Sequence, residues 1–278
     1  MLLTILGSGT SSGVPQLRCG CEVCRSTDPL DRRMRASAML EVKGRRILID
    51  CGPDFHAQML RFGRRSPDDR IDTMLATHQH YDHVGGVDDL RPYTYRKDDP
   101  EYKFPIYCQA DVARDLKIRM PYSLGSHPYP GAPRIILHEM NAFEPFTFEG
   151  IDILPLRVNH YILEMLGFRI GALGYITDAK TIPDRTVEAL KGIDTLIINA
   201  LRFKPHISHQ TVDEALEIIR RINPRQAFLT HLSHDVGLHA EVERKLQEKV
   251  EALQAESSGS FTSTVHFAYD GLTLPIPD

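Results

Sequence analysis

The stretch Thr77-His78-Gln79-His80-Tyr81-Asp82-His83-Val84-Gly85-Gly86 holds three imidazoles and one carboxylate within six consecutive residues. The short, mostly apolar run at 73–77 predicts a strand that leads into it. On an extended segment the first two histidines project to the same side, and the closing glycines let the backbone bend close to an ion. Imidazole and carboxylate are ligands for zinc, iron and manganese, so the stretch predicts a metal site. The alternative is a solvated polar loop, which this density of ligand-type residues disfavours.

The same arrangement recurs along the chain, because other His and Asp residues also stand at the ends of short apolar runs. Asp50, His160, Asp178 and His231 each end such a run or follow it directly. Active sites of layered α/β proteins gather at strand ends, so we expect these side chains to meet. The predicted strands are Leu2–Leu6, Ala38–Val42, Arg46–Asp50, Thr73–Thr77, Pro105–Cys108, Ile151–Val158, Gly174–Thr177, Thr195–Asn199, Gln226–Thr230, Thr264–Ala268 and Leu272–Leu274.

Amphipathic stretches alternate with these strands. They predict helices at Phe55–Phe62, Ala110–Met120, Thr211–Arg221 and Glu241–Leu253. The dipeptide Asp270-Gly271 between the last two strands predicts a hairpin. No internal repeat of fixed period is found, and we expect residues 1–278 to form one α/β domain. The region 91–133 is the least regular, and the sequence does not define its role.

Composition and charge narrow the functional classes. The chain has 278 residues, a formal net charge of −4 and 42% hydrophobic residues, as in an ordinary globular protein. No basic excess indicates nucleic-acid binding, so we expect no nucleic-acid partner. No run approaches the roughly 20 apolar residues that cross a bilayer. The N-terminal segment 1–7 predicts a first strand rather than a leader, and we expect a cytoplasmic protein.

The cysteines are distributed unevenly. Cys19, Cys21 and Cys24 fall within six positions, whereas Cys51 and Cys108 stand alone. An odd count without a secretion signal argues against a disulfide framework. The cluster predicts thiolate metal ligands, with a loop of reduced thiols as the alternative. The two single cysteines are expected to be ordinary buried residues.

Residues 77–86 resemble the T-H-x-H-x-D-H-x-x-G signature of the metallo-β-lactamase superfamily. Asp50, His160, Asp178 and His231 follow in the order of that family. The resemblance implies a four-layer αβ/βα sandwich with a dinuclear metal site between the sheets, and Asp50 would orient a ligand imidazole. It also implies the ligand sets: His78, His80 and His160 for one metal, Asp82, His83 and His231 for the second, and Asp178 as the bridge.

A second resemblance concerns the branch of the superfamily. The run Gly7–Pro15, the cluster Cys19–Cys24 and the run Leu229–His234 resemble the phosphoribosyl cyclic phosphodiesterases of phosphonate degradation. That branch implies two divalent metals, manganese or zinc, in the active site. It also implies a structural zinc held by Cys19, Cys21, Cys24 and His234. Three thiolates with one imidazole form a closed tetrahedral site, which agrees with a structural role.

The branch further implies hydrolysis of a small, cyclic, ribose-type phosphodiester, which would be the partner molecule. Asp82 and His209 are the expected catalytic residues, and His209 would assist proton transfer to the leaving group. The alternative for His209 is a helix-capping segment with an exposed histidine, and His206 is a second candidate for the proton donor. The bulky apolar residues at 161–168 are expected to shape the substrate pocket.

Three other functions remain open. A tRNA-processing nuclease of the same superfamily would need an RNA-docking arm and a basic face, and neither is seen. A relative that serves pyrroloquinoline quinone biosynthesis shares the cysteine cluster. A non-catalytic zinc-binding scaffold would not need all seven ligands of the dinuclear set. The sequence is also compatible with a homodimer.

Overall fold

A computed structural model describes residues 1–64, 66 and 69–278, which form two seven-stranded sheets packed face to face. The first sheet has the order β14-β1-β2-β3-β4-β5-β6 and the second β13-β12-β11-β10-β9-β8-β7. Strands of the first sheet are β1 (Leu2–Gly7), β2 (Ser37–Val42), β3 (Arg45–Ile49), β4 (Thr73–Leu75), β5 (Phe104–Cys108), β6 (Ile135–Glu139) and β14 (Thr273–Pro275). Strands of the second are β7 (Phe146–Phe148), β8 (Ile151–His160), β9 (Leu163–Ile170), β10 (Leu173–Tyr175), β11 (Thr195–Asn199), β12 (Gln226–Thr230) and β13 (Thr264–Phe267).

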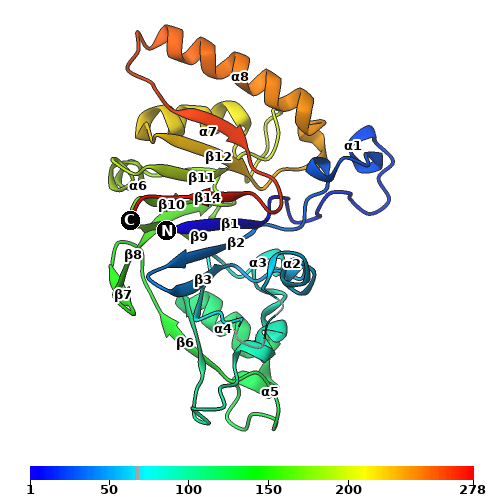
Figure 1. The fold of residues 1–278 in the computed structure, drawn as a ribbon, viewed down its shortest axis with the longest axis vertical. Coiled ribbons are helices and arrows are strands. Elements are labelled where there is room, and N and C mark those ends of the chain that lie inside the picture. Colours follow the sequence, from blue (N-terminus) through cyan, green and yellow to red (C-terminus); the bar gives the residue numbers. More distant parts are fainter. Residues whose placement is uncertain (65, 67–68) are drawn as a thin grey trace.

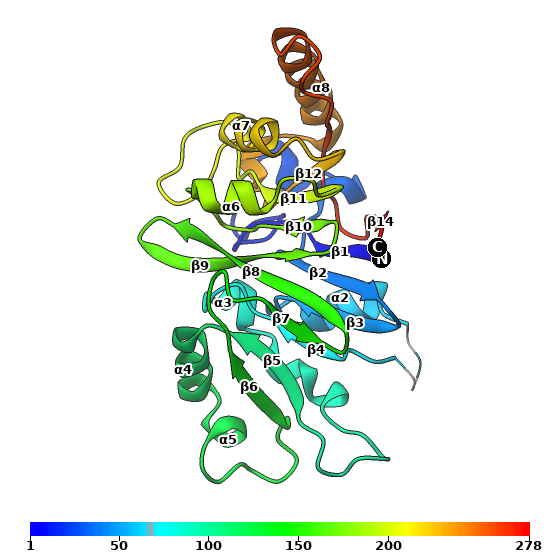
Figure 2. The same ribbon diagram turned by 90° about the vertical axis from the view of Figure 1, so that its left-hand side faces the viewer.

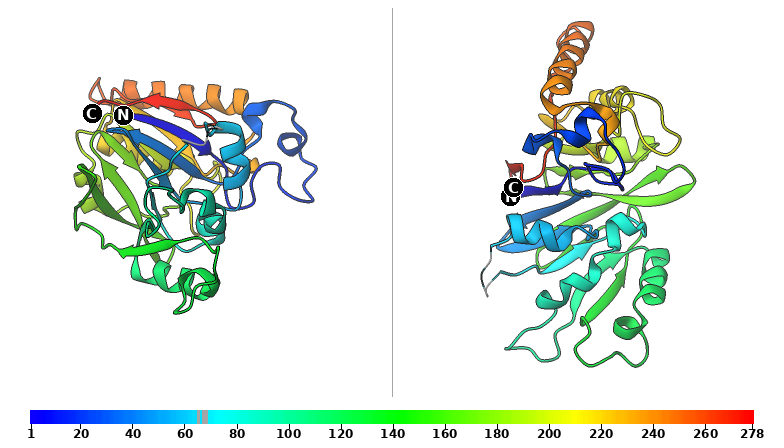
Figure 3. Two further views of the ribbon diagram at one scale, coloured as in Figure 1. Left: turned by 60° about the horizontal axis from the view of Figure 1, so that its bottom comes forward. Right: turned by 90° about the vertical axis from the view of Figure 1, so that its right-hand side faces the viewer.

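Strand direction explains why loops gather at one edge. Strands β3 to β6 run parallel to one another, and so do β10 to β13. The remaining neighbours are antiparallel, including β8 with β9. Parallel strands deliver their carboxyl ends to one edge of the sheet, so the loops that follow β3, β4, β10 and β12 can converge there. The two ends of the described chain lie side by side, where β1 pairs with β14 (Figures 1 and 3).

Helices cover the outer faces of both sheets (Figures 1 and 2). They are α1 (Glu22–Arg25), α2 (Phe55–Phe62), α3 (Tyr81–Val84), α4 (Ala110–Arg119), α5 (Pro121–Leu124), α6 (Asp184–Ala189), α7 (Val212–Ile222) and α8 (His239–Glu256), with short 3₁₀ turns at Pro29–Asp31, Val87–Tyr93 and His234–Val236. Side chains of α2 and α4 pack on the first sheet, and those of α6, α7 and α8 pack on the second. A third apolar cluster lies between the sheets. These layers confirm the predicted αβ/βα sandwich.

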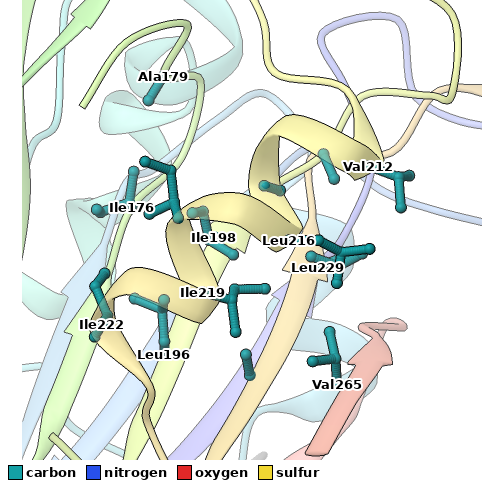
Figure 4. Close-up of a cluster of buried hydrophobic side chains, with 14 of the residues drawn as sticks. Ile176, Ala179, Leu196, Ile198, Val212, Leu216, Ile219, Ile222, Leu229 and Val265 are labelled. Carbon is teal, nitrogen blue, oxygen red and sulfur yellow. The ribbon is translucent and has the colours of Figure 1, made fainter. Parts of the chain in front are cut away.

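Helix α7 illustrates how sequence determines this packing. Thr211 accepts a hydrogen bond from the backbone of Glu214, whose side chain accepts one from the Thr211 backbone, so a capping box starts the helix. Asn223 ends it in the left-handed conformation. The apolar face of the helix points at β11, β12 and β13, as Figure 4 shows for Leu216 and Ile219 beside Leu229. This packing fixes the loop that precedes the helix.

Two predictions about the fold are wrong. The hairpin expected around Asp270-Gly271 does not form, because β13 pairs with β12 while β14 crosses to the other sheet and pairs with β1. The carboxylate of Asp270 instead accepts hydrogen bonds from the backbones of Ser8 and Met34. The apolar run 161–168 does not line a pocket as a whole, because residues from Leu163 onward form β9 and are largely buried in the two cores. None of the helices in the described part of the chain has the length and the apolar character that a membrane-spanning helix requires.

Candidate metal centre and active site

Five residues at strand ends come together at one edge of the two sheets. Asp50 follows β3, His160 ends β8, and His231 follows β12. His78 and Asp178 lie three residues beyond β4 and β10. Asp50, Asp178 and His231 have φ of 61°, 56° and 58°, so the backbone has the left-handed conformation at each of them and changes direction sharply there. That conformation costs about 1–2 kcal/mol for a residue with a Cβ, and such strain concentrates at functional sites.

The short helix α3 brings Asp82 and His83 to the same edge. It lies against the loop after β3, and Cys51 donates its backbone N–H to the His83 carbonyl at 2.7 Å. A Cβ on Gly52 would lie 2.1 Å from the Asp82 carbonyl oxygen, and one on Gly86 would lie 2.1 Å from the Gly52 carbonyl oxygen. Only glycine permits this approach of the two backbones.

The imidazoles of His78, His80 and His160 form the first group. Ring centroids lie 4.6 Å apart for His78 and His80 and 5.2 Å apart for His80 and His160. His160 Nδ1 donates to the Asp178 carbonyl at 2.8 Å, because a carbonyl can only accept. This bond fixes the tautomer and leaves Nε2 of His160 as a lone-pair donor for a metal.

A hydrogen-bonded chain fixes His78 and His83 in the same way. Thr77 donates its hydroxyl to Asp50 at 2.9 Å, so its oxygen accepts from His78 Nδ1 at 3.0 Å. His83 Nδ1 lies 2.7 Å from Asp50 Oδ2, the same carboxylate oxygen that accepts from Thr77. Both Nε2 atoms are buried and lack a hydrogen-bond partner among the described residues. Asp50 therefore orients ligand imidazoles, as the resemblance implied, and Thr77 relays the effect to His78.

The second group consists of Asp82, His83, Asp178 and His231, whose ligand atoms all lie within 4.8 Å of one another. Asp178 Oδ1 lies 2.9 Å from His231 Nε2, and its Oδ2 lies 3.1 Å from His83 Nε2. Neither nitrogen makes a hydrogen bond of acceptable geometry within the described residues. Nitrogen and oxygen lone pairs that point at a common centre, buried and unpaired, fit a divalent metal ion.

The pKa directions describe the charge that this group holds without a metal. Burial alone would raise the pKa of Asp178, but the His231 and His83 charges keep it well below its usual range. Burial opposes the charged form of His231, yet Asp178 raises the pKa of His231 to about 9. Burial, and then the His83 charge, hold the pKa of His78 well below its usual value. The buried carboxylates are thus balanced by imidazolium protons, which bound cations would replace.

His209, in the loop before α7, joins the two groups. Its ring centroid lies 4.7 Å from His160 and 4.9 Å from His231, and its Nδ1 lies 3.8 Å from Asp178 Oδ1. Burial, and then the His231 charge, lower the pKa of His209 to about 3. His206 lies behind it, 5.0 Å from the His209 ring, and its Nδ1 accepts from Ser208. Of the two candidates for the proton donor, His209 is the one next to the ligand groups.

Asn199 is a supporting residue that the sequence reasoning missed. It ends β11 at the same edge, and its amide both accepts from the Ala179 backbone N–H and donates to the Ala179 carbonyl, each at 2.8 Å. This pair of bonds holds the loop that carries Asp178. The position of Asn199 at a strand end could have identified it, because the same signal identified Asp50, Asp178 and His231.

The cysteine cluster forms a separate group near α1. Ligand atoms of Cys19, Cys21, Cys24 and His234 lie within 4.8 Å of one another, and all described cysteines are free. The backbone N–H of Cys24, and then His234, lower the pKa of Cys21 to about 6, while burial raises that of Cys24 to about 11. This set fits a closed tetrahedral metal site. Cys51 and Cys108 are fully buried in the core beneath the first sheet.

Comparisons with known proteins agree with this architecture. A family model described as "Beta-lactamase superfamily domain" matches residues 45–232. The chain is 39% identical to an octanoyltransferase of Porphyromonas gingivalis, over 100% of this chain and 52% of that protein. It is 34% identical to a coenzyme PQQ synthesis protein B of Methylobacterium nodulans, over 56% of this chain and 52% of that protein. The chain thus spans about half the length of these curated relatives.

A solved structure extends the comparison over almost the whole chain. It is described as a new diphosphatase from the PhnP family and is similar at a TM-score of 0.85 and 36% identity, over 98% of this chain and 96% of that one. Taken together, the family match, the sandwich and the ligand groups at its strand ends show that this chain belongs to the metallo-β-lactamase superfamily, and its ligand groups fit divalent metals.

Proposed function

We propose that this protein is a hydrolase, a dinuclear metal-dependent phosphodiesterase that acts on a small, cyclic, ribose-type phosphodiester. The observation that carries the proposal is the position of Asp178, whose two carboxylate oxygens face His231 and His83 while its carbonyl accepts from His160. A carboxylate oxygen of Asp178 also lies within 4.8 Å of a ring nitrogen of His160, so this carboxylate lies between the two ligand groups, as a bridge between two metals must. The 36% identity to a solved diphosphatase of the PhnP family supports phosphorus chemistry.

The ligand sets would hold two cations, with His78, His80 and His160 around one, and Asp82, His83 and His231 around the other. When bound, manganese or zinc would supply positive charge for the phosphoryl oxygens and would acidify water near neutral pH. The chain's own residues keep the imidazoles in the right tautomers, through Asp50, Thr77 and the Asp178 carbonyl. Cys19, Cys21, Cys24 and His234 would hold a third, structural zinc.

His209 is the proposed proton donor. With a pKa of about 3 it is neutral at pH 7 before substrate binds. A phosphodiester brings negative charge to the site, which stabilises imidazolium and raises this pKa. His209 can then hold a proton and pass it to the departing alkoxide, while Asp82 remains an anionic ligand because the His83 and His231 contacts keep its pKa low.

The test combines metal analysis with a substrate panel. We expect about three metals per chain and hydrolysis of a cyclic ribose phosphate and of bis(p-nitrophenyl) phosphate. Asp178→Asn should lower kcat/KM by about 10²-fold or more, since it removes the bridging charge. Asp184→Asn is the matched control, because the Asp184 side chain is 93% exposed and, among the residues that the structure describes, forms an ion pair with Arg221 alone. A single tightly held metal with no hydrolysis would refute the proposal.

The panel also separates the alternatives. Cleavage of structured RNA would favour the nuclease, and full metal content with no phosphodiester hydrolysis would favour a role like that of the PQQ-synthesis relatives or a scaffold. The octanoyltransferase name belongs to a protein of which this chain matches only about half, so acyl transfer is tested separately with an octanoyl thioester.

A further inference from the structure

Large apolar side chains are exposed around the ligand groups. Tyr81 is 60% exposed, Tyr161 57%, Ile162 88% and Ile207 66%. They come from three different parts of the chain: helix α3, the turn between β8 and β9, and the loop before α7. Side chains of this size normally lose exposed area on folding, so their common location needs a reason.

Each of these residues lies within two positions, in sequence, of a ligand-group residue or of His209. Tyr81 separates His80 from Asp82, Tyr161 follows His160, and Ile207 precedes His209 by two residues. The three segments meet, because the His160 ring lies 5.2 Å from His80 and 4.7 Å from His209. Figures 2 and 3 show the β8–β9 turn projecting beyond its sheet beside the loop that precedes α7.

The β8–β9 turn carries the strongest signal. His160 pairs with Leu163, so only Tyr161 and Ile162 form the turn. Tyr161 has a φ of 56°, a conformation that two-residue hairpin turns normally give to Asn, Asp or Gly. A bulky residue here is unfavourable for folding, and its ring is not buried in return. Two other two-residue hairpin turns place charged residues, Lys43 and Glu149, in this conformation, so Tyr161 differs from them by its large exposed ring next to His160.

We propose that Tyr81, Tyr161, Ile162 and Ile207 form an apolar rim that binds the organic group of the substrate. This inference rests on the proposed phosphodiesterase function and specifies its substrate class: a phosphodiester whose organic part carries, beyond the atoms that hold the phosphate, a ring-sized group with an apolar face. The ligand groups take the phosphoryl oxygens, and the rim takes the substituent that extends out of the site. Tyrosine faces and isoleucine side chains suit a planar ring, which they remove from water.

The experiment keeps the leaving group constant and varies the other substituent, and comparison of the variants with the unmodified protein removes the intrinsic reactivity of each ester. Methyl p-nitrophenyl phosphate and phenyl p-nitrophenyl phosphate share one leaving group. The ratio of their kcat/KM values therefore measures the preference of the rim for the phenyl group. We expect the phenyl ester to be favoured by about tenfold or more in the unmodified protein, the scale of a modest apolar contact. Ile162→Ser and Tyr161→Asn should each reduce that ratio to about threefold or less, mainly through KM.

Tyr161→Asn separates binding from stability. Asparagine tolerates the left-handed conformation, so this variant should unfold at the same or a higher temperature while it loses the phenyl preference. Ile136→Ser is the control, since Ile136 is 39% exposed on the edge strand β6 and should leave the ratio unchanged. Equal kcat/KM for the two esters, or an unchanged ratio in both rim variants, would refute the proposed rim and would leave the phosphodiesterase function standing. No hydrolysis of either ester would refute the phosphodiesterase function and the rim with it.

Discussion

Thr77→Val tests the claim that a hydrogen-bonded chain orients the metal ligands. Thr77 is fully buried, and valine has nearly the same shape, so the change removes a hydroxyl without opening a cavity. The hydroxyl donates to Asp50 at 2.9 Å and accepts from His78 Nδ1 at 3.0 Å. In the variant, Asp50 still accepts from the Thr77 backbone N–H at 2.8 Å and still contacts His83 at 2.7 Å. The change therefore removes only the link from Asp50 through the hydroxyl to His78.

The expected magnitude follows from these contacts. The lost bond to the carboxylate contributes about 1.5–3 kcal/mol, and the unpaired His78 N–H costs about 1–3 kcal/mol. The added methyl group returns about 1 kcal/mol, which leaves a loss of about 1.5–5 kcal/mol in the free energy of unfolding. Because His78 is then free to rotate or change tautomer, affinity for the active-site metal should fall about 10–100-fold.

Two measurements check this prediction: urea unfolding of the metal-free protein, and competition for zinc with a chromophoric chelator. Thr195→Val is the matched control. Thr195 is also fully buried, donates to Asp194 at 2.7 Å and accepts from Gln226 at 2.9 Å, but it begins β11 at the end opposite to Asn199. The control should lose stability and keep its zinc affinity. If Thr77→Val binds zinc as tightly as the unmodified protein, the proposed orienting role of this hydroxyl is wrong.

Three further predictions follow from other parts of the site. In the metal-free protein, the pKa of His231 is raised to about 9, so its stabilising charge is complete below about pH 6.5 and is lost as pH rises through 9. Urea unfolding with a chelator present should therefore show up to about 3 kcal/mol less stability at pH 9.5 than at pH 6.5, and a rise would contradict the charge balance described above. Gly52→Ala should cost about 3 kcal/mol and weaken metal binding, because its Cβ would lie 2.1 Å from the Asp82 carbonyl; Gly20→Ala, with nothing within 4 Å of its Cβ, should show neither effect by the same assays. Cys21→Ser should release one zinc and lower the unfolding temperature, and unchanged zinc content with unchanged stability would rule out the structural site.

The sequence predicted the position of the site well because its signals are local. Ligand-type residues at strand ends, such as Asp50 and His231, could be recognised one segment at a time, and parallel strands then bring those ends together. The resemblance to the metallo-β-lactamase superfamily supplied the layer order. The order of strands within each sheet did not come from any local pattern.

What the sequence could not show depends on contacts between distant residues. Asp270-Gly271 has the composition of a hairpin turn, but the Asp270 carboxylate accepts bonds from Ser8 and Met34, which are 262 and 236 residues away. The relay through Thr77 was equally invisible, since a threonine beside a histidine carries no signal until Asp50 is placed next to it. Strand β9 was missed because its apolar run, read in isolation, resembled a pocket wall rather than a strand with both faces covered.

The same site combines strain with rigid support, and the distribution of the two indicates what each residue does. Asp50, Asp178 and His231 have left-handed backbones and are buried, and Asn199 holds the loop that carries Asp178, so their strain positions ligands. Tyr161 has the same backbone conformation with an exposed ring that packs on nothing in the protein's core. Lys43 and Glu149 also have left-handed backbones at exposed hairpin turns, but their charged side chains suit water, whereas the exposed ring of Tyr161 does not. This difference is why we assign Tyr161 to the substrate rather than to the metal centre.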